Sequence, residues 1–203
     1  GIAPDAKWIG CVNLARNLGN PAVYLNCMQF MLAPNPQGGD PFTDGDTTKG
    51  AMIVNNSWGC PLVEGCDMVT FEQAAKAMET AGIFMAVAAG NTGYYGCGSI
   101  TDPLAIYSEV FTVGSISSSG ELSEFSSLGP VTFDGSGRTK PDLLAPGEGI
   151  VMAFPGNQYT IEKGTSFAAP HVAGVVALMW SANPELIGNI ELTRKILEET
   201  ASP

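Results

Sequence analysis

The chain places a serine where it could act as a nucleophile. Thr165 and Ser166 stand where a helix N-cap is expected, and residues 171–182 are almost all apolar or small. Because a proline is tolerated only in the first turn of a helix, Pro170 predicts that this helix begins just before it. A helix that is apolar on all sides is predicted to be buried. A hydroxyl at its N-terminus faces the positive end of the helix dipole, which favours the negative charge that develops when a serine attacks a carbonyl group.

An asparagine with two amide donors follows another apolar stretch. Asn91 comes after Gly90 and after residues 83–89, which are typical of a buried strand. Asparagine close to glycine also favours ordinary turns, so a plain loop is the alternative for Asn91. The alternative for Ser166 is an ordinary capped core helix.

The apolar pattern predicts the elements that would position these residues. Strands are predicted at residues 8–14, 51–55, 83–89 and 111–116, with helices at 22–32 and 68–81. Alternating strands and helices predict a parallel sheet with right-handed crossovers, and ligands bind at the carboxyl ends of such strands. We therefore expect an α/β fold with its site at that edge of the sheet.

The remaining elements are predicted from turn signals and helical spacing. Thr70 and Gln73 are predicted to form a capping box for the helix at 68–81. Residues 149–153 and 159–162 are predicted to pair as a hairpin, and residues 123–130 and 139–148 to be connections. The last helix is predicted around Leu192, Ile196 and Leu197. Since no repeat or linker interrupts the pattern, we expect a single domain over residues 1–203.

The composition indicates a globular protein and argues against two classes of partner. Hydrophobic residues make up 45% of the chain and charged residues 14%, as in a chain with a packed core. The net charge of −11 disfavours nucleic acid, because phosphate contacts need a basic face. The longest apolar run, residues 172–180, is too short for a membrane span. The chain opens with Gly1 and shows no signal segment, so we expect a processed product.

The five cysteines leave several pairings open. Cys11 lies in an apolar run, which favours a buried free thiol, and the others are Cys27, Cys60, Cys66 and Cys97. The last three lie in polar, glycine-rich stretches, where a disulfide is plausible in an oxidising compartment. Because the number is odd, at least one cysteine must stay unpaired within the chain.

Several segments resemble one enzyme family. Gly-Thr-Ser-x-Ala-x-Pro-His-Val-Ala-Gly at residues 164–174 resembles the nucleophile motif of the subtilisin-like serine proteases, the subtilases of peptidase family S8. Residues 1–4, 125–130 and 140–147 also resemble subtilase segments, and residues 57–60 and 64–67 resemble the bacillopeptidase-F-like branch. The resemblance implies a three-layer parallel sheet with helices on both faces. It also implies that this chain matches roughly the C-terminal two-thirds of a catalytic domain, without the N-terminal strands and helix.

The resemblance implies roles for the polar residues. A serine endopeptidase of this family would form its acyl-enzyme on Ser166, and Asn91 would stabilise the oxyanion with its side chain, beside the backbone N–H of Ser166. An extended peptide substrate would add as a strand, contacting the segment Ser57, Trp58 and Gly59 and a pocket edge made by Ala89 and Gly90. Trp58 would form an apolar wall of that pocket, and a plain core position is its alternative.

A serine needs a base, and the base needs an orienting acid. The one histidine, His171, lies five residues after Ser166 in the same helix and is structural in the family motif. No aspartate or histidine motif of the family is present, so both are predicted upstream of Gly1 and this chain alone is predicted to be inactive. A catalytically dead subtilase-like module that binds peptides is the rival interpretation. A lipase or esterase is a third, but the Gly-x-Ser-x-Gly elbow is absent at Ser166.

The resemblance also implies partners and a location. In the family, the strand at 8–14 pairs with an upstream strand, so we expect its edge to be covered by the N-terminal part of the same catalytic domain, by a second copy or by local rearrangement. Calcium is possible by resemblance only, because residues 102–107 look like a loop whose carbonyl groups bind a cation in some relatives. The spacing of Asp40, Asp44 and Asp46 does not fit an EF-hand, so no metal ligand is assigned. We expect a secreted protein.

Overall fold

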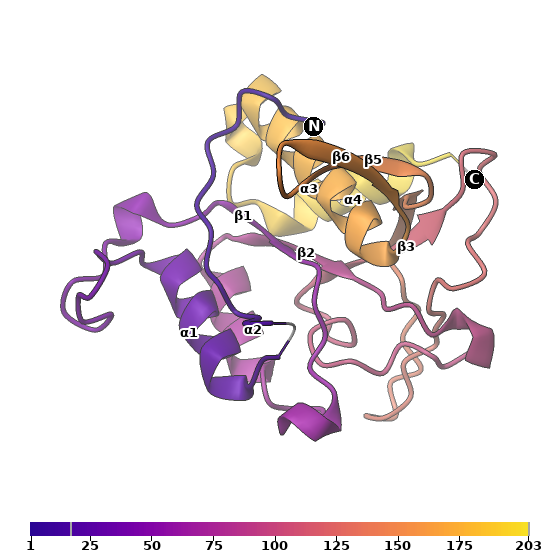
Figure 1. Cartoon of the computed structure of the whole chain (residues 1–203), viewed down its shortest axis with the longest axis horizontal. Coiled ribbons are helices and arrows are strands. Elements are labelled where there is room, and N and C mark those ends of the chain that lie inside the picture. Colours follow the sequence, from indigo (N-terminus) through magenta and orange to yellow (C-terminus); the bar gives the residue numbers. More distant parts are fainter. Residues whose placement is uncertain (17, 203) are drawn as a thin grey trace.

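A parallel sheet of four strands runs through the molecule (Figure 1). The computed structural model describes residues 1–16 and 18–202. The strands pair in chain order, β1 (Ile53–Asn56), β2 (Phe84–Ala88), β3 (Phe111–Ile116) and β4 (Leu143–Pro146). All five residues of β2 are buried, as expected of a central parallel strand that is covered on both faces.

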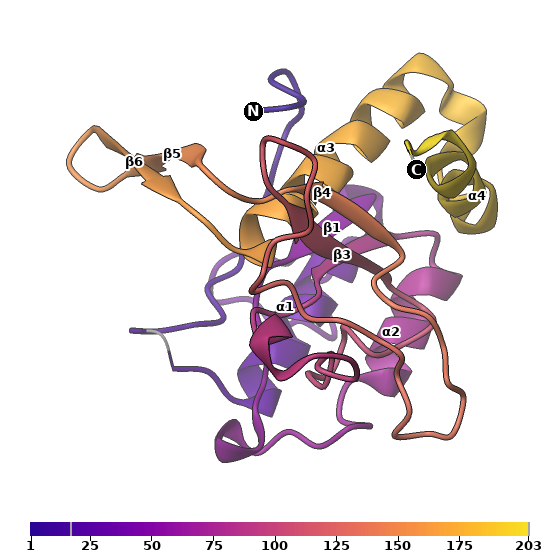
Figure 2. The same cartoon turned by 90° about the vertical axis from the view of Figure 1, so that its right-hand side faces the viewer.

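Helices cover both faces of this sheet (Figure 2). Helices α1 (Pro21–Leu32) and α2 (Glu72–Thr80) pack together on one face, and α3 (Thr165–Ala182) crosses all four strands on the other, with α4 (Ile190–Thr200) beside it. The predicted three-layer α/β fold is therefore confirmed. The four short 3₁₀ helices in the described residues are η1 (Thr47–Lys49), η2 (Leu62–Glu64), η3 (Gly93–Tyr95) and η4 (Pro184–Leu186).

Alternation along β2 creates two separate cores. Successive side chains of a strand point to opposite faces. Met85 and Val87 pack with the α1 and α2 layer, whereas Phe84 and Ala86 pack with α3. The strand thus holds both helical layers, and its carboxyl end is fixed from two sides.

The predicted hairpin is confirmed, and it lies away from the sheet. Strands β5 (Ile150–Phe154) and β6 (Gln158–Glu162) pair antiparallel and project from the body of the molecule (Figure 2). Two other predictions of secondary structure were wrong. Residues 143–146 form β4 instead of a connection, because β3 offers them a parallel partner. Helix α2 begins at Glu72 and has no capping box, because the hydroxyl of Thr70 donates to Asp67 instead.

The prediction of a fully buried helix near Ser166 was also wrong. Helix α3 begins at Thr165, so Pro170 lies inside it. One face packs on the sheet, but Val175 and Leu178 on the other are 40% and 48% exposed. By length and composition, α3 could cross a membrane, and a core helix of a globular protein passes the same test. The packing of α3 against all four strands identifies it as a core helix here.

The cysteines form two disulfide bonds. Cys11 is bonded to Cys27 and Cys60 to Cys66, while Cys97 is free and exposed. The expectation that Cys11 is a buried free thiol was therefore wrong. The bond to Cys27 ties the extended N-terminal segment to α1, a constraint that links residues distant in the sequence.

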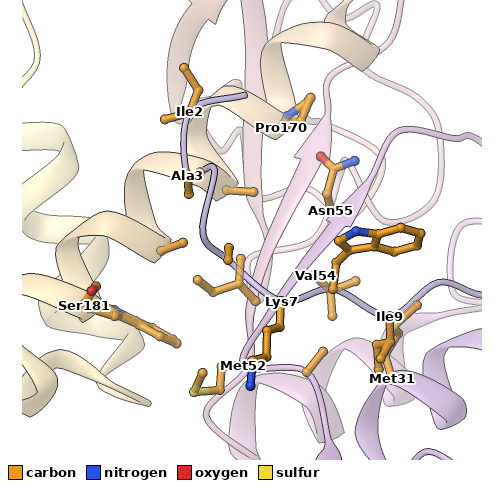
Figure 3. Close-up of a pocket in the computed structure, with 18 of the residues that line it drawn as sticks. Ile2, Ala3, Lys7, Ile9, Met31, Met52, Val54, Asn55, Pro170 and Ser181 are labelled. Carbon is orange, nitrogen blue, oxygen red and sulfur yellow. The ribbon is translucent and has the colours of Figure 1, made fainter. Parts of the chain in front are cut away.

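The apolar run at residues 8–14 forms no strand. Trp8 and Val12 are 87% and 82% exposed, and this segment lies across a cavity of about 890 Å³ from β1 (Figure 3). A strand needs backbone partners, and among the described residues this segment pairs with no strand of the sheet. β1 is therefore an edge of the sheet whose outer side faces the cavity.

A buried ion pair anchors β4. The side chain of Lys140 is nearly fully buried, and its Nζ donates to the carbonyl oxygen of Val110 at 2.8 Å and to Oδ2 of Asp142 at 2.7 Å. Oδ2 also accepts from the backbone N–H of Thr112 at 2.6 Å. Burial lowers the pKa of Lys140, and the charge of Asp142 opposes that shift.

Replacing Asp142 by alanine should leave the Lys140 charge buried and unpaired, which typically costs about 3–5 kcal/mol. Urea denaturation would measure the loss of unfolding free energy. The matched control is Glu72→Ala, which removes the partner of Lys76 in an ion pair at the surface and should cost much less. Equal losses in the two variants would contradict the anchoring role of Asp142.

Candidate active site

The predicted nucleophile lies where the loop after β1 meets the start of α3. Ser166 is the second residue of α3 and is half-buried. Its Oγ lies 3.4 Å from the carbonyl oxygen of Ser57, and the Oγ of Ser57 donates to the carbonyl oxygen of Ser166 at 2.8 Å. Asn55 steadies this pair, because its Nδ2 donates to the Oγ of Ser57 at 2.9 Å. The fold thus brings together Ser57 and Ser166, which are 109 residues apart.

Pro170 explains why Ser57 can bind there. In an α-helix, the carbonyl group of residue 166 would accept from the N–H of residue 170. Proline has no N–H, so the carbonyl oxygen of Ser166 lacks that partner. The hydroxyl of Ser57 fills the gap. Pro170, which the sequence analysis placed at the helix start, therefore leaves free the carbonyl oxygen through which the first turn of α3 binds the loop after β1.

Asn91 is held beside the same helix N-terminus by Thr165. Oδ1 of Asn91 accepts from the backbone N–H of Thr165 at 2.9 Å and from its hydroxyl at 3.1 Å. Because the backbone N–H can only donate, the amide oxygen must face Thr165 and the amide nitrogen must face away. Within residues 1–16 and 18–202 the amide nitrogen of Asn91 has no hydrogen-bond partner, so its two N–H groups are available to a ligand.

Two glycines allow this close approach. Gly90 has a φ of +102°, and Gly164, which caps α3, has a φ of +152°. A side-chain carbon on Gly90 would also lie 2.9 Å from the Oγ of Ser127, whereas one on Gly164 would only be in ordinary contact with Asn91 at 3.6 Å. The backbone N–H of Gly90 donates to Thr165 at 3.2 Å, so both ends of the Gly90–Asn91 turn are attached to the start of α3. The neighbouring Ala89 donates its backbone N–H to Val113 at 3.0 Å, which fixes it to β3.

Trp58 packs differently from the expected pocket wall. Its ring stacks on Tyr24 with centroids 4.2 Å apart and meets the edge of Phe71 at 5.5 Å. This aromatic cluster belongs to the core shared with α1 and α2. The packing favours the alternative that Trp58 is a core residue, and its contact with substrate stays a prediction. Gly59, the next residue, approaches the carboxylate of Asp102.

The histidine is used within its own helix. Nδ1 of His171 lies 2.7 Å from the carbonyl oxygen of Phe167. The sequence holds no other histidine that could act as a base for Ser166. The structural role predicted for His171 is consistent with this contact.

Sequence reasoning missed three residues near the site. Thr165 orients Asn91, and its position beside Ser166 in the motif was the one available signal. Ser127 is fully buried, and its Oγ accepts from the backbone N–H of Thr92 at 3.1 Å. Asp102 is half-buried, and burial raises its pKa, with the charge of Glu64 adding to the effect. Nothing in the local sequence revealed the last two roles.

The described part of the chain holds no cluster of three or more His, Cys, Asp or Glu side chains that could bind a metal ion. The calcium expected from the loop at residues 102–107 would use backbone carbonyl groups, and it stays a prediction.

Comparison with known proteins identifies the family. The subtilase model of the Peptidase S8 family matches residues 1–203. The chain is 36% identical to Bacillopeptidase F of Bacillus subtilis over 207 residues, which cover the whole chain and 14% of that protein. It is 33% identical to Subtilisin DY of Bacillus licheniformis over 156 residues, or 77% of the chain and 52% of the relative.

Solved structures agree with this result. The chain matches a cold-adapted subtilisin-like serine proteinase with a TM-score of 0.75 and 26% identity, over the whole chain and 63% of that structure. A protease from Pseudoalteromonas arctica gives a TM-score of 0.78 at 23% identity, which supports the fold, and is covered over 58% of its length. The chain thus spans less than two-thirds of each of these relatives. From the family match, the identities and the fold together, the chain belongs to the subtilase family of subtilisin-like serine proteases.

Proposed function

We propose that this chain supplies the nucleophile and the oxyanion-binding groups of a serine endopeptidase. The observation that carries the proposal is the orientation of Asn91, whose amide N–H groups are turned away from Thr165 beside Ser166. Donors that are already oriented stabilise a developing oxyanion without reorganisation. The backbone N–H of Ser166 at the start of α3 is the second proposed donor.

The proposed reaction has two steps. The Oγ of Ser166 attacks the peptide carbonyl carbon, the hydroxyl proton passes to a base, and the carbonyl oxygen becomes the oxyanion near Asn91. The C–N bond then breaks, and the leaving amine takes the proton from the base. Water then attacks the acyl carbon while the base accepts its proton. The bond to the Oγ of Ser166 breaks, and the base returns the proton to that oxygen.

The base and its orienting acid are proposed to lie on a segment of the catalytic domain outside these 203 residues. His171 contacts the carbonyl oxygen of Phe167 in its own helix, and the sequence has no second histidine. The chain spans only 63% of the matched cold-adapted proteinase, so its relatives have room for such a segment.

The cavity beside β1 is the proposed docking place of that segment. Its walls are the N-terminal segment, the outer edge of β1 and the inner face of α3, as Figure 3 shows with Ile9, Val54 and Pro170. The volume is about 890 Å³, and one side is the edge of a sheet, whose backbone groups accept an added strand. We propose that a strand of the upstream segment pairs with β1 there and carries the acid close to Ser166.

A peptide-binding module without catalysis is the second candidate. The contact of the one histidine with its own helix favours it. The free donors of Asn91 favour the enzyme, because a module that only binds extended peptides does not need an oriented amide beside a serine hydroxyl. We further propose that the protein is secreted, since its two disulfide bonds would persist in an oxidising compartment.

Labelling with a fluorophosphonate would test the missing base. The purified 203-residue chain should not react, because an unactivated serine hydroxyl is a weak nucleophile. Adding the upstream segment should produce an adduct on Ser166, located by mass spectrometry, and Ser166→Ala should abolish it. Labelling of the chain alone would contradict the need for an upstream base, and no labelling with the segment present would favour the binding module.

Changing Asn91 to aspartate would separate its two roles. The variant keeps an oxygen to accept from Thr165 but loses both N–H donors, so the fold should persist while kcat falls. The expected fall in the complete catalytic domain is about 100- to 1000-fold, as for loss of the oxyanion-hole asparagine in a subtilisin. Asn91→Ala should lower kcat similarly. Unchanged kcat in Asn91→Asp would exclude the proposed oxyanion role.

A further inference from the structure

A carboxylate lies between the two loops that are proposed to bind the peptide. A side-chain carbon on Gly59 would lie 2.8 Å from Oδ2 of Asp102, and one on Gly90 would lie 3.9 Å from the same atom. Gly59 comes two residues after Ser57, which contacts Ser166, and Gly90 directly precedes Asn91. Asp102 therefore lies beside the proposed catalytic groups, and two residues without side chains flank its carboxylate.

This carboxylate has no partner in the described residues. None of the ion pairs within residues 1–16 and 18–202 includes Asp102 or the nearby Glu64. Asp102 is half-buried and accepts no hydrogen bond from the residues that the structure describes, and its pKa is raised by burial first and by the charge of Glu64 second. Buried charges in proteins are normally paired, so an unpaired one beside a binding site points to a cationic ligand.

Neighbouring polar groups hold the carboxylate of Glu64 in place near Asp102. Oε2 of Glu64 accepts from the hydroxyl of Tyr24 at 2.6 Å, and Oε1 accepts from the backbone N–H of Gly19 at 3.3 Å. On the other side, the buried Oγ of Ser127 would lie 2.9 Å from a side-chain carbon on Gly90. A side-chain carbon on Gly59 would collide with the carboxylate of Asp102, and one on Gly90 would collide with the Oγ of Ser127, so a larger residue at either position would crowd this place.

We propose that Asp102 determines substrate specificity by binding the side chain of a lysine or arginine that precedes the scissile bond. This inference rests on the proposed function of the chain as a serine endopeptidase. A long cationic side chain can pass the two glycines and pair with the carboxylate. An apolar side chain would remove water from Asp102 and would supply no hydrogen bond in its place. An acidic side chain would be repelled by the carboxylate. The net charge of −11 also favours the approach of basic peptides.

Cleavage of matched peptides by the complete catalytic domain would test this role. Four quenched-fluorescence peptides would differ only in the residue before the scissile bond, which would be Arg, Lys, Leu or Glu. A charge-assisted pair in a desolvated place should make kcat/KM for Arg and Lys at least about tenfold higher than for Leu and Glu. Equal or faster cleavage after Leu would overturn the proposal without any variant.

Variants would assign the preference to one carboxylate. Asp102→Asn should lower kcat/KM for Arg and Lys at least about tenfold and change the value for Leu less than about threefold, while Asp102→Glu should retain the order of substrates. The control Glu121→Gln removes an exposed carboxylate in a turn and should leave all four values unchanged. An equal effect of Asp102→Asn on all peptides, or the same shift in the control, would contradict the proposal.

Labelling of Ser166 by a fluorophosphonate separates this inference from the one on which it rests, because the reagent carries no amino-acid side chain. Labelling of the complete domain and of Asp102→Asn at equal rates shows that the nucleophile and the fold are intact, so that the peptide ratios report on Asp102. Absence of labelling in the complete domain would overturn the proposed function and this inference with it. Labelling without a preference for basic residues would overturn this inference alone.

Discussion

The site depends on one helix turn that cannot complete its own hydrogen bonds. Pro170 lies inside α3, so the carbonyl group of Ser166 has no partner in the helix, and the hydroxyl of Ser57 supplies one at 2.8 Å. A buried or half-buried carbonyl group without a partner is costly, which makes this contact a strong constraint. It fixes the loop after β1 to the start of α3. The position of Ser166 relative to the sheet follows from that attachment.

Thr165 adds the second attachment. Its backbone N–H and hydroxyl both reach Asn91, and the hydroxyl also accepts from the backbone N–H of Gly90. The loop after β2 is thereby joined to the same turn of α3 as the loop after β1. Because the first N–H groups of a helix have no partner within it, the N-terminus of α3 offers donors and a positive dipole to both loops. One helix end thus organises all of the polar groups proposed for catalysis.

Apolar residues from three parts of the chain line one cavity. The outer edge of β1, the N-terminal segment and part of α3 all face a cavity of about 890 Å³. Each carries hydrophobic residues typical of a core, and Trp8, which lines the cavity, is 87% exposed. Large apolar surfaces on a soluble protein usually mark a contact with another element. We propose that the segment that docks there also supplies the backbone partners that residues 8–14 lack.

The sequence by itself determined the features that depend on residues close together along the chain. Periodicity and turn signals predicted the parallel sheet, α1, β3 and the hairpin closely, and the residues from Gly164 to Gly174 predicted the family, whose resemblance implied the layers. The single domain over residues 1–203 stays a prediction. Only the tertiary structure decided what depends on distant residues: the bond of Cys11 to Cys27, the packing of Trp58 on Tyr24, and the orientation of Asn91 by Thr165. β4 was missed and residues 8–14 were overpredicted for the same reason, since a strand forms only where a neighbour provides hydrogen-bond partners, and local sequence does not contain that neighbour.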